Sequence, residues 1–250
     1  MKKVIPIVIT VLVVFLTFLI YKGFDDKKIY YLALGDSLAA GRDSYGNYGA
    51  GYSDYINEYL EVNDKLDKFV KDFAVSGYKV DDLINDINNN KEITLNNKKI
   101  YLKNALVKAN LITLSIGSND VIRAFKSNSD LDEAITNTLG KVNELLEILR
   151  VYNKDTIVVT SYYNPYYFNI KWNSKIANAN TKLKQLCKKY DIIYVDIYSL
   201  FQNSEYLPNA LDPHPSSLGY KKISDLIINE LGDELWIITG YLAMYLNGCL

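Results

Sequence analysis

Two short motifs bring together residue types that can carry out nucleophilic chemistry. Ser37 follows Gly35 and Asp36 directly after an apolar run, and His214 stands between two prolines, two residues after Asp212. A serine hydroxyl becomes a good nucleophile when a base within hydrogen-bond reach removes its proton, and a neutral imidazole can do this near neutral pH. Asp212 is the nearest carboxylate that could hold the imidazole in one tautomer and offset its positive charge.

His214 is the only histidine among the 250 residues. One imidazole excludes zinc sites with three histidines, His-Glu-x-x-His protease helices and iron centres with two histidines. Neither a metal nor a cofactor is expected, and if the protein uses a histidine as a base, that residue is His214.

The net charge of −1 is unevenly distributed along the chain. Five lysines and two aspartates give residues 1–28 a charge of +3, which leaves −4 for residues 29–250. An acidic body lacks the basic face that binding to a phosphate backbone requires. The composition thus excludes nucleic acid as an expected partner.

Residues 1–28 have the pattern of a membrane anchor. Lys2 and Lys3 precede 18 uncharged residues, 4–21, and Lys22 follows them. A helix of this length spans about 27 Å, near the lower limit for crossing a bilayer core. Bulky residues at its end favour an uncleaved single-pass anchor over a cleaved secretory signal. We expect a short cytoplasmic N-terminus and a catalytic domain outside the cytoplasm.

Buried strands and helices alternate over residues 29–231. The pattern predicts one three-layer α/β/α domain with a five-stranded parallel sheet, while residues 232–250 form an apolar tail of unknown role. Residues 89–104 are polar and are expected to form an exposed loop or hairpin. The expected strands are 29–34, 69–75, 111–116, 156–160 and 192–196, and the expected helices lie near 53–61, 79–88, 130–150, 172–190 and 216–231.

Small polar motifs follow the first three expected strands, at the sheet edge where ligands bind in such folds. Ser37 follows the first strand, Gly77 the second, and Asn119 in Gly-Ser-Asn-Asp the third. Each motif alone has a structural alternative: Asn119 could cap a helix, Asp212 could cap the last helix, and His214 could be a turn residue. Their order along the chain is the more specific signal.

In this order the motifs resemble those of the SGNH hydrolases, also called the GDSL esterase/lipase family. The resemblance covers residues 29–231 and implies a flavodoxin-like fold. It also implies that Ser37 is the nucleophile and His214 the base. The oxyanion hole would consist of the backbone N–H groups of Ser37 and Gly77 and the side-chain amide of Asn119. The family usually has Asp-x-x-His, whereas Asp212 lies only two residues before His214. Either Asp212 reaches the imidazole across the Pro213 turn, or a backbone carbonyl orients the ring and leaves a Ser-His dyad.

The predicted function is that of a serine esterase acting through an acyl-enzyme on lipid, lysolipid or small acyl esters. One alternative is a carbohydrate O-acetyl esterase or transferase acting on surface glycans, and another is a catalytically silent binding module. The residues that bind substrate and the oligomeric state are left open. The tyrosine-rich segment 162–168 and the glycine-rich loop 46–52 are two candidate walls of the site.

Overall fold

The computed structural model describes residues 28–165, 170–202 and 205–238. Residues 1–27 of the predicted anchor and residues 239–250 of the apolar tail lie outside these ranges. Within the described ranges, no helix is both long enough and apolar enough to cross a bilayer.

A five-stranded sheet forms the centre of the molecule, with strand order β2-β1-β5-β6-β7. All four neighbouring pairs are parallel, as predicted. A separate antiparallel hairpin, β3 and β4, occupies the polar stretch that was expected to be a loop or hairpin. The strands are β1 (Ile29–Gly35), β2 (Leu66–Val70), β3 (Glu92–Leu95), β4 (Lys98–Tyr101), β5 (Leu111–Ser115), β6 (Thr156–Thr160) and β7 (Ile193–Val195).

Two cores lie on opposite faces of the sheet, because successive side chains of a strand point to opposite sides. In β1, Leu32 and Leu34 belong to one core, and Tyr31 and Ala33 belong to the other. Every residue of β1 is buried, which is typical of a strand covered on both faces.

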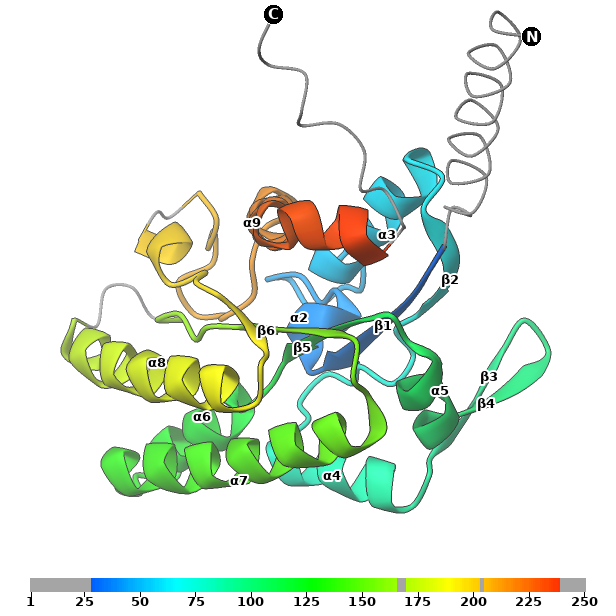
Figure 1. Cartoon of the computed structure of the whole chain (residues 1–250). Helices are drawn as coiled ribbons and strands as arrows, with labels where there is room; N and C mark the ends of the chain where they lie inside the picture. The colour runs from blue at the N-terminus through cyan, green and yellow to red at the C-terminus, as the bar shows by residue number, and fades with distance from the viewer. Residues whose placement is uncertain (1–27, 166–169, 203–204, 239–250) are drawn as a thin grey trace, which may run out of the picture.

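Helices cover both faces, and Figure 1 shows the resulting three layers. The first core packs against α4 (Val80–Asn88), α5 (Leu102–Lys108), α7 (Leu131–Tyr152) and α8 (Lys171–Lys189). The second packs against α2 (Ser37–Ala40), α3 (Tyr52–Val62), the 3₁₀ helix η1 (Ser199–Gln202) and α9 (Ser217–Ile238). Another helix, α6 (Ser118–Lys126), packs beside α7.

The second strand differs most from the sequence prediction, which placed it at 69–75. The strand β2 is Leu66–Val70, an edge strand with several partly exposed side chains and therefore no continuous apolar run. Phe73 supplied part of the apolar pattern, yet it is buried in the first core from a turn rather than from a strand. Only Ala74 in this turn pairs with β1, through a single bridge to Gly35.

Candidate active site

Ser37 lies where β1 turns into α2. Gly35 ends the strand with a φ of 125°, a conformation that favours glycine. A Cβ atom on Gly35 would lie 1.9 Å from the carbonyl oxygen of Ser115 in the neighbouring strand β5. The close approach of the two strands therefore requires glycine, and it places Ser37 at the start of α2.

Asp36 braces this turn from inside the protein. Its Oδ1 accepts hydrogen bonds from the backbone N–H of Leu38, at 3.1 Å, and from the hydroxyl of Ser115, at 3.2 Å. Burial raises the pKa of Asp36 from 3.8 to about 7. Asp36 caps the N-terminus of α2, in agreement with a bracing rather than a reacting carboxylate.

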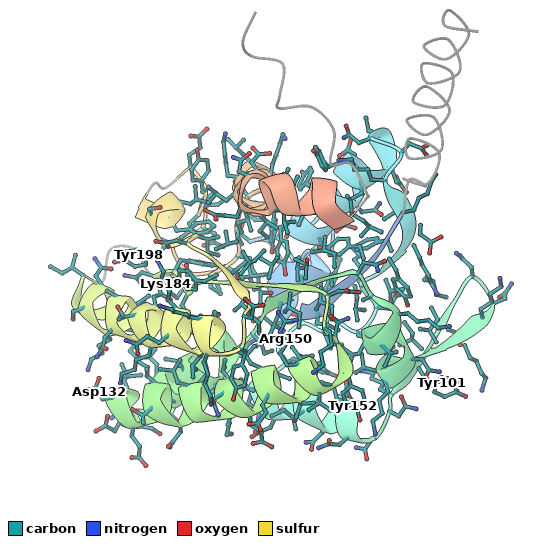
Figure 2. All side chains as sticks on the ribbon, in the orientation of Figure 1. Tyr101, Asp132, Arg150, Tyr152, Lys184 and Tyr198 are labelled. Atoms are coloured by element: carbon teal, nitrogen blue, oxygen red, sulfur yellow. The ribbon has the colours of Figure 1, made fainter. Side chains whose placement is uncertain are left out.

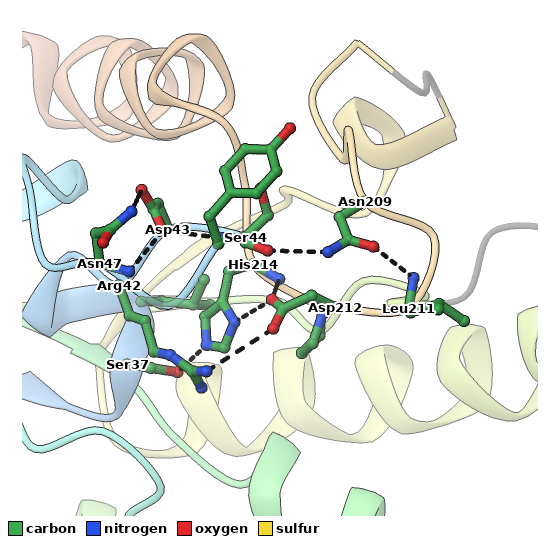
Figure 3. Close-up of polar contacts among 12 residues, drawn as sticks. Ser37, Arg42, Asp43, Ser44, Asn47, Asn209, Leu211, Asp212 and His214 are labelled. Carbon is green, nitrogen blue, oxygen red and sulfur yellow. Dashed lines mark hydrogen bonds and ion pairs between the residues drawn. The ribbon is translucent and has the colours of Figure 1, made fainter.

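Ser37, His214 and Asp212 form a continuous chain of hydrogen bonds (Figure 3). Nε2 of His214 lies 2.7 Å from Oγ of Ser37, and Nδ1 lies 2.5 Å from Oδ1 of Asp212. The serine and the histidine are 7% and 5% exposed. The arrangement is that of a nucleophile, a base and an orienting acid.

The two-residue spacing of Asp212 and His214 is bridged because the Asp212 side chain closes an Asx turn across Pro213. The same Oδ1 of Asp212 that contacts the imidazole also accepts the backbone N–H of His214, at 3.0 Å. The carboxylate thus folds back over its own turn to reach the ring, which is the first of the two possibilities left open by the sequence. The N-terminus of α9 is capped instead by Ser216, whose Oγ accepts the N–H of Gly219 at 3.1 Å.

Tyr163 of the tyrosine-rich segment and Arg42, which the sequence did not single out, hold this turn. The hydroxyl of Tyr163 donates a hydrogen bond to the carbonyl of Pro213, at 2.5 Å. Arg42 places Nη2 3.9 Å from Oδ2 of Asp212, the carboxylate oxygen that does not contact the imidazole. Both contacts join segments far apart in the chain, so no local sequence pattern predicts them.

The environment of His214 favours its neutral form. Burial lowers the pKa of His214 below its ordinary value, the hydrogen bond to Asp212 opposes this shift, and the charge of Arg42 adds to it. The imidazole is therefore mostly neutral at pH 7 and able to accept a proton from Ser37.

The three predicted oxyanion-hole residues, Ser37, Gly77 and Asn119, line the same cavity as His214. Gly77 has a φ of 85°, and a Cβ atom on it would meet no atom within 4 Å. Glycine is thus required by the backbone conformation and not by crowding from the protein. Within the described residues, nothing accepts a hydrogen bond from the backbone N–H of Ser37 or of Gly77. Both N–H groups are available to an oxyanion.

Asn119 and Asp120 fasten the Gly77 segment to α6. Nδ2 of Asn119 donates to the carbonyl of Tyr78 at 3.0 Å, which uses one of its two amide protons. Asp120 accepts the backbone N–H of Val80 at 3.2 Å, while Gly117 occupies the N-cap position of α6. Asn119 is therefore not a helix cap, and its second proton remains available to a ligand.

The cavity at this site has a volume of about 130 Å³. Tyr162 and Tyr163 line it, as expected for the tyrosine-rich segment, whereas loop 46–52 contributes no lining residue. Residues 166–169 of that segment lie outside the described ranges. Across the described part of the chain, no three His, Cys, Asp or Glu side chains gather in a way that could hold a metal ion.

Comparison with known families agrees with this geometry. A family model described as GDSL-like lipase/acylhydrolase matches residues 31–227. The chain belongs to this family. It is therefore a carboxylic ester hydrolase of the GDSL, or SGNH, type. A search of curated proteins finds no significant match.

Solved structures of ester hydrolases share the fold of this GDSL hydrolase. The lipase Lip_vut3 from a goat rumen metagenome is 25% identical, with a TM-score of 0.66 over 80% of this chain and 96% of that one. The acetylxylan esterase Axe2 from Geobacillus stearothermophilus is 19% identical, with a TM-score of 0.61 over 83% of this chain and 96% of that one. The second likeness concerns the fold alone.

Proposed function

We propose that the protein is a serine esterase in which Ser37 forms an acyl-enzyme, with His214 as base and Asp212 as the orienting acid. The observation that carries the proposal is the unbroken chain from Oγ of Ser37 through His214 to Asp212 beside a cavity. The substrate class is a lipid, lysolipid or small acyl ester.

In the acylation step, Oγ of Ser37 attacks the carbonyl carbon while Nε2 of His214 takes the hydroxyl proton. The carbonyl oxygen becomes an oxyanion, with Gly77 and Asn119 beside Ser37 as its hydrogen-bond donors. When the intermediate collapses, the ester C–O bond breaks and His214 returns the proton to the leaving alkoxide. Water then attacks the acyl-enzyme with the same base, which releases the acid and restores Ser37.

Replacing Ser37 tests this mechanism. Ser37→Ala removes the nucleophile, and hydrolysis of p-nitrophenyl butyrate should fall about 10⁶-fold or to the buffer background. The matched control is Ser127→Ala at the exposed C-terminal end of α6, where the hydroxyl contacts only the carbonyl of Ala124 and the hydroxyl of Ser129. Circular dichroism should be the same for all three proteins. Activity that persists in folded Ser37→Ala contradicts the proposal.

We further propose that residues 1–28 hold the protein in a membrane with the catalytic domain outside the cytoplasm. The support is the uncharged stretch 4–21 between flanking lysines. The full chain should sediment with membranes, and protease added to the extracytoplasmic side of intact cells should cleave its catalytic domain. Recovery of the full chain in the soluble fraction would overturn the anchor, and protection from added protease would overturn the orientation.

A further inference from the structure

The cavity at Ser37 extends into a gap between α6, α7 and α8. Its lining there is mainly apolar, with Thr138 and Lys175 as polar members, and comes from all three helices. On α7 the lining residues are Leu131, Ile135, Thr138 and Leu139, whose spacings of three and four positions place them in a single stripe along that helix. The main apolar lining residues are Val121, Ile122, Leu131, Ile135, Leu139 and Ile176.

Helix α6 shows that this gap is not part of the packed core. An amphipathic helix normally buries its apolar stripe against the core. None of the nine residues of α6 is buried, and its Val121 and Ile122 line the cavity instead. The apolar residues Val121 and Ile122 of α6 therefore gain further contacts when an apolar ligand fills the gap.

Two contacts join the helices around the gap and limit its length. Trp172 of α8 lines the gap and packs edge-on against Phe125 of α6, with ring centroids 4.8 Å apart. Lys175 of α8 also lines the gap and forms an ion pair of 2.6 Å with Asp132 at the start of α7; Asp132 is labelled in Figure 2. These contacts favour a ligand of limited length.

The chemistry of the site determines which part of an ester enters this gap. The carbonyl oxygen must face Gly77 and Asn119, and the leaving oxygen must lie near Nε2 of His214 to receive its proton. The third substituent of the carbonyl carbon is the acyl chain. The α6 residues Val121 and Ile122, which follow Asn119 in the chain, line the gap, so the gap adjoins the oxyanion-hole end of the cavity and is open to that substituent.

We propose that this gap is an acyl-chain pocket that selects medium-chain acyl esters, of about six carbons, over acetyl esters. This inference rests on the proposed function. The whole cavity, from Ser37 to the gap, has a volume of about 130 Å³, comparable to that of an apolar cavity of about 150 Å³ that binds benzene, a ligand of six carbons. An acyl group that fills it, carbonyl carbon included, therefore has about six carbons. An acetyl group would leave most of the apolar lining without contacts.

A series of p-nitrophenyl esters from acetate to dodecanoate tests the pocket. Each methylene that enters it should raise kcat/KM about 4-fold, so that hexanoate exceeds acetate by on the order of 10²-fold. The kcat/KM should stop rising between the hexanoate and octanoate esters and should fall for the dodecanoate ester. A flat series, or one that peaks at acetate, would overturn the pocket and leave the proposed function standing if activity still requires Ser37.

Variants of Ile135, a residue of the pocket wall, also test the pocket. Ile135 is only partly buried, so Ile135→Trp can fill the gap without replacing a core residue. We expect the hexanoate-to-acetate ratio of kcat/KM to fall at least 10-fold in Ile135→Trp, and the optimum to move to longer chains in Ile135→Ala. Val151→Trp is the matched control on the same helix, where the side chain is 69% exposed, and it should keep the wild-type ratio.

A binding measurement separates failure of the pocket from failure of the function. In Ser37→Ala, calorimetric titration should show hexanoate binding more tightly than acetate, with the preference lost in Ser37→Ala/Ile135→Trp and kept in Ser37→Ala/Val151→Trp. Equal affinities for the two acids in Ser37→Ala would overturn the pocket. A chain-length preference in binding, together with no esterase activity in the wild type, would contradict the proposed function and support the pocket.

Discussion

Replacing Asp212 by Asn probes the least usual feature of the site, the two-residue spacing between acid and base. Oδ1 of Asp212 accepts both the imidazole Nδ1–H and the backbone N–H of His214. An asparagine oxygen can keep the backbone hydrogen bond and therefore the turn. The variant removes the negative charge while leaving the local fold in place.

The expected loss of kcat is on the order of 10⁴-fold, the size seen when a triad aspartate becomes asparagine and the imidazole loses its required tautomer. The pH profile should change as well. Asp212 raises the pKa of His214 against the effect of burial, so its removal should move the acid limb of kcat/KM to lower pH. In the wild type this limb should already lie below pH 6.5, because burial lowers the pKa of His214 from that value.

The assay is steady-state hydrolysis of p-nitrophenyl butyrate between pH 4.5 and 8.5, with circular dichroism as a check on folding. Asp43→Asn is the matched control: Asp43 also bears a negative charge near His214, but its carboxylate contacts only its own exposed turn. The kcat of Asp43→Asn should stay within about 3-fold of the wild-type value, because interactions of exposed charges have small energies. A loss of less than 10-fold in Asp212→Asn, with no shift of the acid limb, would refute the role assigned to Asp212.

Three further substitutions have expected outcomes. Asn119→Ala removes an oxyanion donor and should lower kcat by about 10²–10³-fold with little change in KM, measured by the same assay; an unchanged kcat would contradict the oxyanion hole. Tyr163→Phe removes the hydrogen bond to Pro213 and should lower the free energy of unfolding by about 1 kcal/mol in urea titrations. A free energy of unfolding equal to that of the wild type would contradict a stabilising role for this hydrogen bond. The pKa of Asp36 is about 7 in the folded protein, against an ordinary value of 3.8. As the pH rises between these two values, the unfolded state loses the proton of Asp36 while the folded state keeps it. The free energy of unfolding of the wild type should therefore fall by up to about 4 kcal/mol across this pH range. Asp36→Asn has no such proton, so in urea titrations from pH 4 to pH 8 its free energy of unfolding should rise relative to that of the wild type. A difference between the two proteins that does not depend on pH would contradict the raised pKa of Asp36.

The alternation of buried strands and helices was sufficient to predict the three-layer fold, and the order of the sequence motifs was sufficient to predict most of the candidate site. Ser37, Gly77 and Asn119 each follow a strand, and parallel strands end at one edge of the sheet, so the topology alone predicts that they meet. His214 could be assigned because no other imidazole exists in the chain. Local sequence pattern and sheet topology together thus predict which residues meet at the site.

Other features depend on contacts that local pattern does not encode. Whether Asp212 reaches the imidazole depends on the conformation of the Pro213 turn, which spacing alone left open. Arg42 and Tyr163 contact this turn from more than forty residues away in the chain. The apolar gap is a property of three helices together, and one of them, α6, was not predicted because its side chains are not buried in the core.

Labelling with a fluorophosphonate probe tests the central claim most directly. The probe reacts with an activated serine and leaves a covalent adduct that peptide mapping by mass spectrometry can locate. The wild-type protein should carry one adduct, on Ser37, and both Ser37→Ala and His214→Ala should carry none on the time scale of the wild-type reaction. Absence of an adduct on the wild type, an adduct on another residue, or equally fast labelling of His214→Ala would contradict a nucleophilic Ser37 activated by His214.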